Sequence, residues 1–71
     1  MTLDEMKRQY RAKQEKIQTH EAERAEAIKR DDPAVLRRIR FRLEMTRVEA
    51  EELRMWGNRE LTRQLREAIS H

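Results

Sequence analysis

A single strong helix breaker divides a chain of 71 residues that otherwise favours helix throughout. The chain contains one proline, Pro33, which directly follows the acidic pair Asp31-Asp32. Proline is favoured at the first position of a helix, where its missing N–H costs nothing, and aspartate is a favoured N-cap. The sequence therefore predicts a turn at residues 31–33, with Asp32 as the N-cap of a new helix.

Composition favours long helices and leaves almost nothing for a sheet. Ala, Glu, Lys, Leu and Arg make up more than half of the residues, a bias typical of coiled coils. One glycine and few β-branched residues leave little material for strands and hairpin turns. The predicted fold is all-α in a single domain of residues 1–71. A helix over about residues 3–30, with Thr2 as a candidate N-cap, packs antiparallel against a helix over about residues 33–70 as a coiled-coil-like hairpin.

Gly57-Asn58 is a second, softer break signal, and it leaves an alternative open. A C-cap glycine followed by an asparagine N-cap would separate a third helix from about residue 58 onward. The apolar stripe keeps its phase across Gly57, and an interior glycine costs a helix only about 1 kcal/mol. One long second helix, straight or bent at Gly57, is therefore the favoured prediction.

Charges along the two predicted helices form complementary blocks. Residues 21–26 are mainly acidic and residues 37–42 mainly basic, and a fold at residues 31–33 makes them neighbours. Further from the turn the signs reverse, with the basic segment 7–16 facing the acidic segment 49–52. Each exposed pair contributes little free energy, but the block pattern favours the antiparallel arrangement.

The predicted seam between the helices carries one apolar set on each helix. In reverse order, these sets are Leu3, Met6, Tyr10, Ile17, Ala25 and Ile28 against Leu61, Leu53, Ala50, Leu43, Ile39 and Leu36. Polar residues interrupt the seam at three levels, namely at Lys13 or Gln14, at His20 or Glu21, and at Arg24. The first helix is therefore expected to be the weaker partner.

A second apolar face on the second helix is the leading candidate site. Counted at 100° per residue, this face lies roughly opposite the seam. Its members are Phe41, Met45, Val48, Met55 and Trp56. Exposed side chains of these types are typical of interfaces, and a chain this short has a small core of its own. We expect a homodimeric four-helix bundle with the second helices central; cover by a folded-back third helix and binding of another protein are the alternatives.

An arginine-rich run at the start of the second helix is the other candidate site. It contains Arg37, Arg38, Arg40 and Arg42, with Phe41 among them. Arginines neutralise phosphates, and an aromatic ring stacks on bases. Because these arginines spread around the helix and the net charge is only +3, pairing with the first helix is the favoured interpretation. Contact with nucleic acid or with an acidic protein remains the alternative.

No constellation of catalytic or metal-ligating residues is evident. The chain has no cysteine, and His20 has only Glu23 at helical ligand spacing, so a seam or solvated histidine is expected. His71 is terminal and expected to be frayed. No serine has a plausible base, and no glycine-rich phosphate loop is present. We therefore expect no enzymatic activity, no cofactor and no metal.

The predicted function follows from these exclusions and from the second apolar face. With no long apolar segment, we expect a cytoplasmic protein with no membrane partner. The leading hypothesis is a small non-enzymatic adaptor or regulator that acts by protein–protein binding. A nucleic-acid-binding regulator and a structural assembly subunit are the alternatives.

Overall fold

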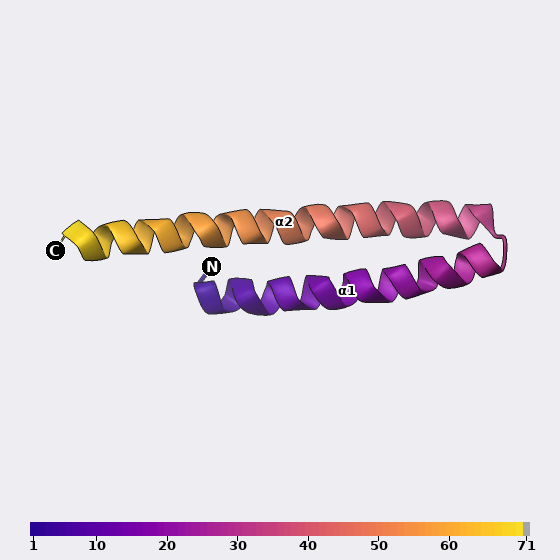
Figure 1. Ribbon diagram of the computed structural model, residues 1–71, viewed down its shortest axis with the longest axis horizontal. Helices are drawn as coiled ribbons and strands as arrows, with labels where there is room; N and C mark the ends of the chain where they lie inside the picture. The colour runs from indigo at the N-terminus through magenta and orange to yellow at the C-terminus, as the bar shows by residue number, and fades with distance from the viewer. Residues whose placement is uncertain (71) are drawn as a thin grey trace.

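In the computed structural model, two α-helices run antiparallel and pack along one another (Figure 1). α1 spans Leu3–Lys29 and α2 spans Pro33–Ser70. The structure describes residues 1–70, so the expectation for His71 lies outside it. The extents of 60 × 15 × 15 Å match one helix of 38 residues with a shorter helix beside it, because a helix rises about 1.5 Å per residue. The predicted all-α hairpin is confirmed, while its dimerisation stays a prediction.

Both helices begin at the N-caps that the sequence predicts. Thr2 Oγ1 accepts a hydrogen bond from the Glu5 backbone N–H at 3.2 Å, and Asp32 Oδ1 accepts one from the Val35 N–H at 3.3 Å. The Asp32 carbonyl also accepts from the Leu36 N–H at 3.0 Å, the first backbone hydrogen bond of α2. Side-chain oxygens thus satisfy N–H groups that the first helical turn leaves without partners.

Between the helices, Asp31 occupies a position that glycine usually holds. Its φ of 53° lies in the left-handed region. The Asp31 N–H donates to the Ile28 carbonyl and the Asp32 N–H to the Ala27 carbonyl, both at 3.2 Å. This pair of hydrogen bonds is the Schellman motif, which ends a helix by reversing the chain direction. α1 thus ends at Lys29, one residue before the predicted end at about residue 30, and the turn begins at Arg30.

Covered side chains recur on both helices at alternating spacings of three and four residues, which is the heptad pattern of a coiled coil. In α1 this seam consists of Leu3, Met6, Tyr10, Lys13, Ile17, His20, Arg24 and Ala27. In α2 it consists of Leu36, Ile39, Leu43, Thr46, Ala50, Leu53, Gly57 and Glu60. The fold is therefore a short antiparallel coiled coil closed at one end by the turn.

Gly57 lies inside α2 and is buried against Met6. A Cβ at this position would overlap the terminal methyl of Met6 and would lie 3.3 Å from its Sδ. The missing side chain leaves room for the end of the Met6 side chain, so Met6 lies against Gly57, one turn beyond Leu53, its predicted partner. Because α2 continues through Asn58, the alternative of a separate third helix is wrong, and no such helix covers the outer face.

The seam differs from the predicted one at both ends. Ala27 is buried, whereas the predicted Ala25 is exposed and Ile28 is 55% exposed. At the other end Leu61, predicted to face Leu3, is 46% exposed. The reason is the helical period, because a coiled coil repeats every 3.5 residues and a straight helix drifts from that repeat by about 20° per heptad. A pattern counted at 100° per residue therefore leaves the true seam towards its ends.

The hydrophobic core is small. Among residues 1–70 no large side chain is fully buried, and the buried apolar residues are Ala27, Ile39, Leu43 and Ala50. Thr46 is also buried, and its hydroxyl donates to the Arg42 carbonyl at 2.8 Å. Polar seam residues on α1, predicted at three levels, are Lys13, His20 and Arg24. A core this thin stabilises an isolated hairpin only marginally.

Candidate interaction surfaces

Four large apolar side chains, here called the outer stripe, are exposed on α2 outside the seam, and two of them, Phe41 and Met45, also line a shallow groove together with residues 12–20 of α1. The four are Phe41, Met45, Val48 and Met55, and they are 66%, 45%, 52% and 45% exposed. Their spacings of four, three and seven residues follow the same seven-residue repeat as the seam, so they form one row along the helix. This row is as regular as a coiled-coil seam, but its members are exposed.

Trp56 departs from the predicted apolar face. It is half-buried on the flank of the seam, where it lines a shallow groove together with Leu53, Met1 and Gln9. The indole is therefore more buried than the four stripe residues, and Glu52 lines the same groove. The five residues predicted as one patch are thus four stripe residues and one tryptophan that covers the edge of the intramolecular contact.

Two charged residues complete the row of the outer stripe. Glu52 occupies the position between Val48 and Met55, and Arg38 precedes Phe41 by one turn. Both are exposed, and neither forms an ion pair within residues 1–70. The stripe thus carries opposite charges towards its two ends. Sequence reasoning missed their place in the row, although the seven-residue repeat alone identifies it.

The arginine-rich run does not make the contacts that the sequence predicts for it. Its members Arg37, Arg38, Arg40 and Arg42 are all exposed, and no ion pair to any of them is formed within residues 1–70. On the acidic end of α1, Glu21 instead pairs with Arg47 at 2.9 Å, and Glu26 with Arg30 at 3.8 Å. Arg38 lies on the outer row. Four exposed cations therefore remain available to a partner.

The second predicted charge block does join the helices. Lys13 Nζ on α1 pairs with Glu49 Oε2 on α2, across the seam. The hydrogen bond and the charge of Lys13 hold the pKa of the Glu49 carboxyl below its usual value, and the charge of Lys16 acts in the same direction. This pair fixes the register of α1 against α2 near the middle of the hairpin.

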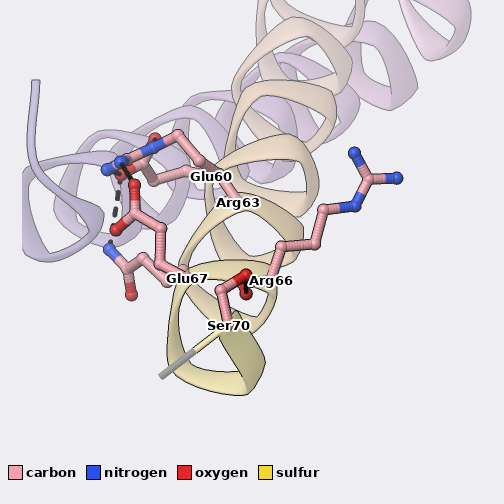
Figure 2. A network of polar contacts seen from close by, with 6 residues as sticks. Glu60, Arg63, Arg66, Glu67 and Ser70 are labelled. Carbon is pink, nitrogen blue, oxygen red and sulfur yellow. Dashed lines mark hydrogen bonds and ion pairs between the residues drawn. The ribbon is translucent and has the colours of Figure 1, made fainter.

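The C-terminal part of α2 extends past the beginning of α1 (Figure 1), and residues 61–70 are all exposed. Figure 2 shows how this segment arranges its charges: Arg63 lies between Glu60 and Glu67, whereas Arg66 points away from them. The hydrogen bond from Arg63 lowers the pKa of the Glu60 carboxyl. These pairs are local to one exposed helix, which they support.

His20 is not part of a metal-ligand cluster within residues 1–70. Its Nδ1 lies 3.9 Å from Glu23 Oε2 and is buried without a hydrogen-bond partner. In the described part of the chain, no three histidine, aspartate or glutamate side chains are grouped to hold a metal ion. The side chain therefore belongs to the seam, one of the two environments expected for it.

Neither helix has a stretch that is apolar enough, over the length required, to cross a bilayer within residues 1–70. No family model matches the sequence, and no curated protein and no solved structure matches it. The surfaces of the hairpin are therefore the features that bear on its function.

Proposed function

We propose that this protein is a small non-enzymatic adaptor or regulator that binds another polypeptide through the outer stripe. The observation that carries the proposal is the exposure of four large apolar side chains in one row of α2. Contiguous exposed apolar patches of this kind mark interaction sites. Methionine and phenylalanine are among the residue types enriched at interface cores, and methionine adapts its shape to a partner.

The hairpin presents this row on a rigid support. The segment from Phe41 to Met55 lies within the part of α2 that packs along α1, so the row stays straight over about 21 Å. A row of apolar side chains at helical spacing fits a complementary helix or a hydrophobic groove. Binding of an extended strand would need a free sheet edge, and residues 1–70 contain no strand.

Site-specific crosslinking in the native cell tests this proposal. A photo-crosslinking amino acid placed at Val48 should yield an adduct with a polypeptide, and Met45→Asp in the same chain should abolish it. The matched control places the crosslinker at Leu65, which is 63% exposed in the overhanging segment and lies off the stripe. No polypeptide adduct at position 48, or equal adducts at both positions, would contradict the proposal.

Nucleic-acid binding is the second candidate, and the exposed arginine-rich run favours it. Each arginine that neutralises a phosphate releases a counterion, which makes binding steeply salt-dependent. In this case, neutralising Arg37, Arg38, Arg40 or Arg42 singly should reduce the salt slope by about one, whichever sequence is offered. Retention of duplex DNA and single-stranded RNA at rising salt concentration measures that slope. The outer stripe should then be dispensable for binding.

A further inference from the structure

We infer that the polypeptide on the outer stripe is a second copy of this chain, whose α2 lies antiparallel to the first, with Arg38 of each protomer paired with Glu52 of the other. This inference rests on the proposed function, because it names the partner of the same surface. The inference is carried by the order of charges along the stripe. Two copies of the stripe bring opposite charges together only when the second copy runs in the opposite direction.

The sequence of the row sets the register. Read along α2, the row is Arg38, Phe41, Met45, Val48, Glu52 and Met55. When a second row is reversed so that Met45 is level with the partner's Val48, these two apolar residues meet, and Met55 is level with the partner's Arg38. Phe41 is then level with the partner's Glu52, and Arg38 lies one helical turn further on. An arginine reaches across such a step to a carboxylate, as side chains three or four residues apart do within a helix.

The charges exclude a parallel pair in register. A parallel arrangement places Arg38 against the partner's Arg38 and Glu52 against the partner's Glu52, and like charges in contact are destabilising. The antiparallel arrangement replaces both repulsions with two symmetric attractions. Arg38, which forms no ion pair within residues 1–70 of the hairpin, is thus complementary to Glu52 of another copy.

The position of the stripe determines the shape of the assembly. Because the stripe lies outside the seam, the two α2 helices lie in the centre of the assembly and each α1 stays beside its own α2.

Sedimentation equilibrium over a range of concentrations is the first test. We expect a species of twice 8.7 kDa that dissociates on dilution, and we expect Val48→Asp to remain monomeric. A monomer at all concentrations would overturn the inference. The proposed function would survive that result if the crosslinker at position 48 captured a different polypeptide, so the two failures are distinguishable.

Charge reversal is the second test, and it stays informative if Val48→Asp does not fold. Arg38→Glu and Glu52→Arg should each weaken dimerisation by at least about tenfold, because each creates two like-charge contacts. The double variant should restore dimerisation. Arg40→Glu is the matched control, since Arg40 is exposed off the stripe and should leave the dissociation constant unchanged. Failure of the double variant to restore dimerisation would refute the pairing.

A distance measurement tests the direction of the helices. The chain has no cysteine, so Ala34→Cys gives a single spin-label site at the exposed start of α2. The inferred register places the two labels roughly 35–40 Å apart, from a rise of about 1.5 Å per residue. A parallel pair would bring them to the spacing of adjacent helices, about 10 Å. A dominant short distance would overturn the antiparallel arrangement.

Discussion

At the scale of single residues, the backbone of Asp31 is strained because the turn places this residue in the left-handed conformation. Its positive φ is disfavoured for a residue with a Cβ, although aspartate tolerates it better than most. Helix ends of this geometry usually place glycine there. The strain is therefore a property of the turn, which follows the end of α1 at Lys29 and reverses the chain before Pro33.

Replacing Asp31 with glycine should therefore stabilise the hairpin. Glycine removes the steric cost of the left-handed conformation but gains conformational freedom in the unfolded chain, which offsets part of that benefit. We expect the free energy of unfolding to rise by about 0.5–1 kcal/mol for Asp31→Gly. Asp31→Ala, which keeps a Cβ without the polar group, should lower it. Urea denaturation of the three proteins gives the comparison, and a less stable glycine variant would be contrary to the expectation.

His20 is the polar seam residue with an unmet hydrogen bond. Its Nδ1 is buried without a partner, and a buried polar atom in that state costs folding free energy. His20→Leu should remove this cost and add apolar contact in the seam, raising the free energy of unfolding by about 1–2 kcal/mol. Thr19→Leu, at the exposed neighbouring position, is the control and should change it little. An unchanged or lowered stability in His20→Leu would show that the imidazole is satisfied, for example by water.

At the scale of the helices, local signals were readable from the sequence and the long-range register was not. The caps at Thr2 and Asp32 depend on residues within one turn, so residue identity alone predicts them. The seam towards Ala27 depends on whether the repeat is 3.5 or 3.6 residues, and that choice is made by the contact with the other helix. The burial of Gly57 depends on Met6, which is far away in sequence.

The candidate site shows the same division. The apolar members Phe41, Met45, Val48 and Met55 were predicted as a face because their spacing lies within one helix. Assigning Trp56 required knowing which flank of α2 meets α1. Recognising Glu52 and Arg38 as part of the same row required the seven-residue repeat, since at 100° per residue the row drifts around the helix.

Gly57 permits a direct test of close packing between the helices. Gly57→Leu should lower the free energy of unfolding by about 1–2 kcal/mol, because the new side chain enters the space that Met6 fills, and overpacking outweighs the gain in helix propensity. Asn58→Leu is the matched control at the next, exposed position, where only the propensity gain applies. Thermal unfolding followed by circular dichroism measures both. Equal stabilities for the two variants would show that the helices do not depend on this close approach.

At the scale of the whole molecule, the small core of the seam and the exposed apolar area of the outer stripe are related. The seam buries few large side chains, so two helices alone give marginal stability. The outer stripe offers further apolar area to a partner, and any partner that binds only the folded hairpin stabilises it by mass action. Two ion pairs join α1 to α2 within the hairpin, Lys13–Glu49 and Glu21–Arg47.

The Lys13–Glu49 pair makes the stability of the hairpin depend on pH. In the folded chain Lys13 holds the pKa of Glu49 below its usual value of 4.5, so the unfolded state binds the proton more readily than the folded state. The stabilisation is therefore fully present above about pH 4.5 and is lost as the pH falls through the lowered pKa. Glu51 and Glu60 shift in the same direction through pairs within α2, so the wild-type chain loses stability in acid for more than one reason.

Glu49→Gln isolates the contribution of the Lys13–Glu49 pair. At pH 7 the variant should unfold at a lower urea concentration than the wild type, and the two should converge as the pH falls below 4.5, because the wild-type carboxyl becomes protonated as the pH passes through its lowered pKa. Glu15→Gln is the control, since Glu15 is exposed and forms no ion pair within residues 1–70. All samples need one protein concentration, because association itself stabilises the fold. A difference between wild type and Glu49→Gln that stays constant from pH 7 to pH 2 would mean that the pair contributes no pH-dependent stability to the hairpin.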